Sequence, residues 1–225
     1  MTTYWGVDSA NPATARIANQ LLFDYVSQLA GGMPAFWGRY IGGRYSLTPA
    51  EAGFLHSRDC RILLVYNGTL NNPSSIQGGL AEGTADAQKA ILAAQTLATP
   101  PNVCIFADIE TGWPLTVDWC RGWAIAVQQS GYKAGFYGNP LQSNALYFCE
   151  PYCSAYSSEP ALVNSLVFSS EPEPGCSTAG NAPAFVPSTP SCNSAGTVVW
   201  QYAENCFNGQ VDQDLAIDDG LAAMW

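Results

Sequence analysis

The stretch Val103-Cys104-Ile105-Phe106-Ala107-Asp108-Ile109-Glu110 joins a continuous apolar run to two acidic residues at its end. A short run of this kind predicts a strand buried on both faces, as in a parallel sheet covered by helices. We therefore expect a strand from Val103 to Asp108. Because side chains alternate along a strand, Asp108 and Glu110 should point to the same side while Ile109 faces the other way.

Similar apolar runs recur on both sides of this strand, separated by helical patterns, which indicates βα units and a parallel sheet. The other expected strands are Tyr4 to Asp8, Phe36 to Ile41, Arg61 to Tyr66, Lys133 to Tyr137, Leu166 to Ser169, Thr197 to Tyr202 and Val211 to Ala216. Eight strands favour one TIM-type (β/α) barrel over an open sheet, with a single domain spanning residues 1–225. The helical pattern is poor after about residue 140, so the second half should be less regular.

Capping residues predict where the helices of the first half begin and end. The expected helices run from Asn11-Pro12 to Gly31, from the capping box Thr48-Pro49-Ala50-Glu51 to His56, from Ala85 to Ala98 after Thr84, and from Thr116 to Gly131. Residues Asp8 to Pro12, after the first strand, contain no glycine-rich phosphate-binding pattern, which argues against nucleotide binding.

The charge balance restricts the kinds of partner. The chain has 18 Asp and Glu residues against 8 Lys and Arg, a net charge of −10, which repels phosphate backbones and anionic lipid heads. Nucleic acid is therefore not an expected partner. No apolar run is long enough for a membrane span, and we expect a monomer.

The eight cysteines form an even set that permits four disulfides. No pair has C-x-x-C spacing and His56 is the only histidine, so neither a metal site nor another cofactor is expected. Four cysteines lie in a Cys-, Pro- and Ser-rich loop region, about residues 140–195, where bridges can replace missing core: Cys149, Cys153, Cys176 and Cys192. Cys104 and Cys120 can be either packed core or bonded. Cysteine number and low Lys content favour a secreted protein whose signal peptide is absent from this sequence.

Acidic residues stand at the ends of several expected strands, where β/α barrels carry their function. Asp8 ends the first strand, Asp108 ends the fourth with Glu110 two residues later, and Asp212 and Asp214 lie in or beside the last. Neighbouring carboxyls push one pKa upward, so that one acid stays protonated while another is ionised. Cleavage of a glycosidic bond needs this division of roles.

Other side chains near these strand ends are candidate substrate contacts. Aromatic side chains can stack on sugar faces or simply pack in the core, and the candidates are Tyr66, Tyr137, Trp200 and Tyr202. Arg39 can pair with the acidic cluster or contact an anionic substrate. Asp214 is either part of the site or an ordinary cap or loop residue.

Five short motifs occur in the order seen in family 25 lysozymes, and the chain resembles that family of glycoside hydrolases over nearly its whole length. They are Gly6-Val7-Asp8-Ser9, Asp108-Ile109-Glu110, Gly135-Phe136-Tyr137-Gly138-Asn139, Trp200-Gln201-Tyr202 and Val211-Asp212. The runs Gly38-Arg39-Tyr40-Ile41 and Phe106 to Glu110 make it still more similar to the glycoside-hydrolase-like relatives of the family.

The resemblance implies a role for each acid. Glu110 would be the general acid, Asp108 would orient or stabilise a substrate group at the reacting carbon, and Asp8 and Asp212 would complete an acidic ring. The family has Asn at the position of Asp214, where the extra carboxyl of this chain can raise neighbouring pKa values or shift substrate preference.

The resulting hypothesis is a lysozyme-like glycoside hydrolase that acts on a polysaccharide with N-acetylated sugars, such as peptidoglycan. Two alternatives remain: a carbohydrate-binding or cell-surface domain without turnover, and a hydrolase of another glycan.

Overall fold

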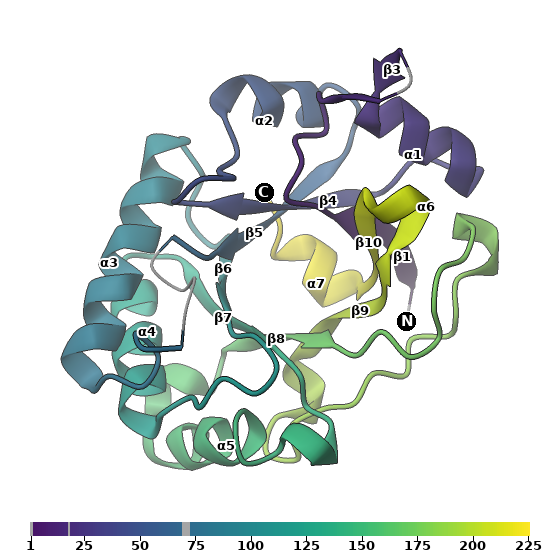
Figure 1. Cartoon of the computed structure of the whole chain (residues 1–225). Helices are drawn as coiled ribbons and strands as arrows, with labels where there is room; N and C mark the ends of the chain where they lie inside the picture. The colour runs from purple at the N-terminus through teal and green to yellow at the C-terminus, as the bar shows by residue number, and fades with distance from the viewer. Residues whose placement is uncertain (1, 18, 69–72) are drawn as a thin grey trace.

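The computed structural model describes residues 2–17, 19–68 and 73–225 and has a closed eight-stranded barrel at its centre (Figure 1). The barrel strands are β1 (Thr3–Asp8), β4 (Phe36–Ile41), β5 (Arg61–Tyr66), β6 (Cys104–Asp108), β7 (Lys133–Gly138), β8 (Leu166–Ser170), β9 (Thr197–Asn205) and β10 (Val211–Ile217). Around the barrel they follow the order β1, β10, β9, β8, β7, β6, β5, β4. The TIM-type barrel and all eight expected strands are confirmed.

The sheet is not parallel throughout, which corrects the expectation from the repeating βα pattern. β10 pairs antiparallel with both β9 and β1, whereas the other neighbours are parallel. The turn between Asn205 and Val211 is too short for a crossover, which needs about a dozen residues or more, so the chain reverses as a hairpin. As a result, the first residues of β10 lie at the same rim as the carboxyl ends of the other strands, and Asp212 pairs with Asp8.

Most of the helices lie outside the barrel (Figure 1). They are α1 (Leu22–Ala30), α2 (Pro49–His56), α3 (Leu80–Thr96), α4 (Val117–Gln129), α5 (Cys149–Ser158), α6 (Cys206–Gly209) and α7 (Asp218–Ala222), with 3-10 turns η1 (Gln142–Asn144), η2 (Pro160–Leu162), η3 (Ala179–Asn181) and η4 (Ser194–Gly196). The predicted caps are confirmed at Thr48, which accepts from the Glu51 amide, and at Thr116, which accepts from the Trp119 amide.

The first helix begins ten residues later than Pro12, so that prediction is wrong. The Ala13 amide donates to Glu51 Oε1 at 2.8 Å, and a two-stranded hairpin, β2 (Arg16–Ile17) with β3 (Gln20–Leu21), occupies the expected first turns. Asn19 in the turn of this hairpin has a φ of 69°, a backbone conformation that a right-handed helix cannot contain. A tertiary contact and a turn residue thus override the Asn-Pro start signal.

The third helix begins earlier than predicted, at Leu80 rather than after Thr84. Gly83, near the start of this helix, explains why the helix extends further toward the amino terminus than predicted. A Cβ on Gly83 would lie 2.2 Å from the Trp119 carbonyl oxygen, and one on Gly122 would lie 2.2 Å from that of Leu80. Two glycines facing across α3 and α4 let the backbones approach closely, and this contact holds the first turn of α3 in place.

The second half is less regular, as expected, although α5 forms within the region predicted to be loop. Two disulfides connect that region, Cys153–Cys192 and Cys176–Cys206. The other four cysteines are free thiols: Cys60, Cys104, Cys120 and Cys149. Cys104 and Cys120 are packed core, whereas Cys206 forms a bridge from outside the predicted region.

Two apolar layers hold the barrel together. The inner layer fills its lumen with side chains that include Phe36, Phe106 and Phe168, and the outer layer lies between strands and helices. α7 and the last residues close the amino-terminal end, where the Cys104 amide donates to Ala223 O (Figure 1). The open end is therefore the one at the carboxyl ends of the parallel strands. Among the described residues, no helix is both long and apolar enough to cross a membrane.

Candidate active site

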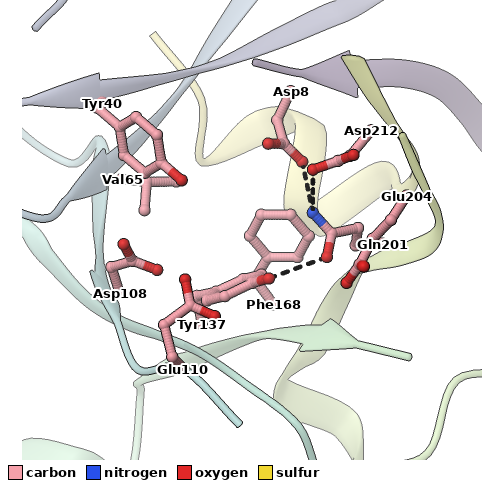
Figure 2. A pocket seen from close by; sticks show the side chains of 10 residues that line it. All are labelled: Asp8, Tyr40, Val65, Asp108, Glu110, Tyr137, Phe168, Gln201, Glu204 and Asp212. Carbon is pink, nitrogen blue, oxygen red and sulfur yellow. Dashed lines mark hydrogen bonds between the residues drawn. The ribbon is translucent and has the colours of Figure 1, made fainter. Parts of the chain in front are cut away.

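A pocket of about 230 Å³ opens at this end of the barrel (Figure 2). It is lined by Asp8, Tyr40, Val65, Asp108, Glu110, Tyr137, Phe168, Gln201, Glu204 and Asp212. Five of these ten side chains carry a carboxyl group, and they come from β1, β6, β9 and β10 and from the residues after β6. The structure thus brings together the four acids that the sequence singled out as catalytic candidates.

Gln201 links the acids of one wall. Its Nε2 donates to Asp8 Oδ2 at 2.9 Å and lies 3.4 Å from Asp212 Oδ2, as Figure 2 shows. The Tyr137 hydroxyl donates to Gln201 Oε1 at 2.9 Å, which fixes the orientation of the amide. Asp212 Oδ1 accepts from the Asn205 amide at 2.7 Å. This network holds two carboxylates at defined positions before any ligand arrives.

The opposite wall carries Asp108 and Glu110, which both face the pocket as strand alternation predicts (Figure 2). Asp108 is buried, and its burial together with the charges of Glu110 and Asp8 raises its pKa well above the usual value. Glu110 is exposed at the rim. The pocket walls still shield part of its carboxyl group from water, and this desolvation, together with the charges of Glu204 and Asp212, raises the pKa of Glu110 as well.

On the wall with Gln201, hydrogen bonds partly oppose the effect of burial on the pKa values of the acids. Burial and the charge of Asp212 raise the pKa of Asp8 to about 7, while the hydrogen bond from Gln201 acts against the rise. Burial also raises the pKa of Asp212, but the Asn205 amide opposes it. The pocket therefore contains four acids whose pKa values are all raised by burial, and hydrogen-bond donors that favour the ionised form act on Asp8 and Asp212.

Asp8 should make the protein less stable as the pH rises from about 4 to about 7. Its pKa in the folded state lies above the usual 3.8, so the folded protein binds the extra proton in this range and loses that advantage as Asp8 ionises. We expect the Asp8→Asn variant to gain up to about 4 kcal/mol relative to wild type between pH 4 and pH 8. Urea unfolding of both proteins across this range measures the difference, and parallel stability curves would contradict the prediction.

Three of the predicted aromatic contacts do not line the pocket. Tyr66 stacks on Trp123 with ring centroids 6.0 Å apart, and Trp200 Nε1 donates to the Glu171 carbonyl at 3.2 Å. The Tyr202 hydroxyl accepts from Trp5 Nε1 at 3.0 Å. All three side chains are buried in the outer layer, so they pack in the core, the alternative that the sequence left open. Tyr137 alone of the four lies in the pocket.

Arg39 and Asp214 also lie outside the pocket lining. Arg39 is 1% exposed and pairs with Glu51, with Nε 2.8 Å from Oε1, rather than with the acidic cluster. Asp214 is completely buried in the lumen, close to Asp8 and Asp212. Neither side chain can contact a substrate directly in this structure.

Sequence reasoning missed five lining residues: Tyr40, Val65, Phe168, Gln201 and Glu204. Three of them neighbour a residue that was chosen instead, since Tyr40 follows Arg39, Val65 precedes Tyr66, and Gln201 lies between Trp200 and Tyr202. The right motifs were found, but the wrong side of the strand was selected. A glycine on the same strand could have indicated which side of the strand faces the pocket. Gly38 precedes Tyr40 by two residues on the same face, and a Cβ there would lie 2.4 Å from Asp8 Cβ.

The pocket acids do not form a metal centre. Among the described residues, no three His, Cys, Asp or Glu side chains are arranged to hold a metal ion.

Comparison with solved structures finds the same fold in other proteins. An uncharacterized protein of B. stearothermophilus is 30% identical, with a TM-score of 0.85, and the match covers 99% of this chain and 100% of that chain. The Tat-secreted protein Rv2525c of Mycobacterium tuberculosis is 14% identical over 96% of both chains, with a TM-score of 0.58. The catalytic domain of an endolysin from a bacteriophage of Listeria monocytogenes is 15% identical, covering 98% of this chain and 96% of that one, with a TM-score of 0.59.

These last two likenesses show a shared fold. A search of curated protein sequences finds no match. The family model described as Rv2525c-like, glycoside hydrolase-like domain matches residues 32–184, a stretch that includes the Asp108-Ile109-Glu110 motif. Together with the relative that is 30% identical over the whole fold, this match confirms the glycoside-hydrolase-like character expected from the sequence. The chain belongs to the family of Rv2525c-like, glycoside hydrolase-like domains.

Proposed function

We propose that this protein is a lysozyme-like glycoside hydrolase that cleaves glycosidic bonds in a polysaccharide with N-acetylated sugars, such as peptidoglycan. One observation carries the proposal. Glu110, an exposed carboxyl with a raised pKa, lies across the pocket from Asp8 and Asp212, two carboxyls that both accept hydrogen bonds from Gln201. Glycoside cleavage uses one protonated and one ionised carboxyl placed on the two sides of the scissile bond.

Glu110 is the general acid in this mechanism. Its raised pKa favours the protonated form that a general acid needs, and its position at the rim lets it recover its proton from solvent after each turnover. It therefore protonates the leaving glycosidic oxygen as the bond breaks.

Asp212 is the best placed anion. The Asn205 amide and the Gln201 side-chain amide both donate to it, and such donors favour the ionised form. An ionised Asp212 stabilises the positive charge that develops on the sugar ring in the transition state. Asp8 shares the Gln201 donor and adds negative charge to this wall once it ionises, near pH 7.

Asp108 has a different role. Its raised pKa favours the neutral form, which can donate a hydrogen bond to a polar substrate group beside the reacting carbon. The phenol rings of Tyr40 and Tyr137 form side walls that can contact sugar faces (Figure 2).

The related folds support the choice of substrate. Proteins with this fold include the catalytic domain of an endolysin and a modular autolysin of Streptococcus pneumoniae. Two disulfides and the fold shared with a Tat-secreted protein support an extracellular location for this chain.

The direct test is incubation of the purified protein with peptidoglycan, chitin-type oligosaccharides and polysaccharides that lack N-acetyl groups. We expect new reducing ends only from the polymers with N-acetylated sugars. Cleavage confined to the other polymers would identify a hydrolase of another glycan. Saturable binding without any product over a long incubation would instead identify a carbohydrate-binding domain and overturn the proposal.

A further inference from the structure

Asp214 is a fully buried carboxyl in the lumen of the barrel. It lies two residues after Asp212 on β10 and pairs with Gly6 of β1, so its side chain is one layer deeper than those of Asp212 and Asp8. Its exposed fraction is 0%, and neither carboxyl oxygen accepts a hydrogen bond from any described residue. A buried polar group without a donor is rare in folded proteins and calls for an explanation.

The groups around Asp214 supply no positive charge. The groups whose charge acts on Asp214 or is affected by it are Asp8 on β1, Asp212 on its own strand and, from the outer layer, the Tyr202 phenol on β9; those that interact with Asp8 in turn are Asp108, Glu110, Tyr40 and Tyr137. No ion pair among the described residues includes Asp8, Asp212 or Asp214. An ionised Asp214 would therefore be an unpaired buried charge, which costs several kcal/mol.

A neutral Asp214 resolves this conflict, because a protonated carboxyl becomes a donor. The acceptor placed to take this proton is the Asp8 carboxylate, which lies on the same face of the neighbouring strand β1, diagonal to Asp214 in the pairing of β1 with β10. We propose that Asp214 remains protonated through the working pH range and donates its O–H to Asp8, which makes it a positioning residue for that acid. The relevance of this contact to catalysis rests on the proposed function.

Burial, followed by the charges of Asp8 and Asp212, raises the pKa of Asp214 well above the usual value, in agreement with a retained proton. Asp8 then has two donors, the Asp214 hydroxyl and Gln201 Nε2. Together they fix its rotamer and favour its ionised form, against burial and the charge of Asp212. An asparagine amide at position 214 would supply an N–H donor of similar shape that never ionises.

Two variants separate donation from packing. Asp214→Asn keeps a donor, whereas Asp214→Leu keeps a similar volume and removes it. The measurement is ¹³C NMR titration of carboxyl-labelled aspartate in the wild type and both variants, with infrared detection of the neutral carboxyl at pH 7. We expect a neutral Asp214 carboxyl in the wild type, an Asp8 titration in Asp214→Asn within about half a pH unit of it, and an upward shift of about one to two pH units in Asp214→Leu.

An ionised Asp214 in the wild type at pH 7 would overturn the proposal, even if Asp214→Leu failed to fold. So would an Asp8 titration that Asp214→Leu leaves unchanged, because a purely structural residue alters stability and not the proton affinity of its neighbour. None of these measurements uses turnover. A protein that cleaves no glycan but shows the expected titrations would disprove the proposed function and leave the role of Asp214 intact.

Discussion

The Glu110→Gln variant is expected to lose about 100-fold to 10,000-fold of the glycan-cleaving rate while keeping its fold. Glutamine has nearly the same shape as glutamate but carries no proton that it can transfer to the leaving oxygen. Glu110 is exposed at the rim of the pocket, so its replacement leaves the packing of the barrel unchanged. The initial rate of reducing-end release from peptidoglycan, together with the circular dichroism spectrum, measures both parts of the prediction.

The matched control is Glu150→Gln, which removes an exposed carboxyl from α5, outside the pocket lining. This variant should cleave at the wild-type rate. If Glu110→Gln also retained the full rate, general-acid catalysis by Glu110 would be excluded.

Removal of the Arg39 guanidinium should cost about 3–5 kcal/mol of unfolding free energy. Arg39 is buried and bridges three segments: Nε lies 2.8 Å from Glu51 Oε1, Nη1 donates to Ser9 O at 2.5 Å and Nη2 donates to Tyr45 O at 3.1 Å. An Arg39→Met variant would leave the Glu51 carboxylate buried without its charge partner. It would also release the backbone that follows Asp8. Urea unfolding at pH 7 gives the free-energy difference.

Two comparisons make this prediction specific. Arg44→Met removes an exposed arginine from the loop after β4 and should change the unfolding free energy by less than about 0.5 kcal/mol. The double variant Arg39→Met, Glu51→Met should be more stable than Arg39→Met, because no unpaired charge remains. A double variant that loses the sum of both single losses would show that the two side chains act independently, through their other contacts, and would contradict the explanation by a stranded charge.

The strands could be predicted from local sequence because their residues are apolar on both faces and end at clear turn signals. The run from Phe36 to Ile41 becomes β4 without change of bounds, and the cap at Thr48 starts α2 as expected. The Asn11-Pro12 signal failed for a nonlocal reason. The Ala13 amide bonds to Glu51, which lies 38 residues later in the chain.

The acidic motifs could also be predicted as a group, since parallel strands bring their carboxyl ends to one rim. Selection of Arg39, Tyr66, Trp200 and Tyr202 failed because the sequence motifs do not by themselves say which face of a strand points inward. The inward set is Tyr40, Val65 and Gln201, one residue away in each case. A shift by one residue reverses the face of every side chain in a strand.

The sequence by itself determined the barrel class, the positions of its strands and the acids at its open end, because these depend on apolar periodicity and on residues next to strand ends. Only the tertiary structure decided that β10 runs antiparallel, which side chains face the lumen, and which cysteines pair. Each of these depends on contacts between distant segments. The same holds for Asp214, since its burial beside Asp8 arises from the pairing of β1 with β10 at opposite ends of the chain.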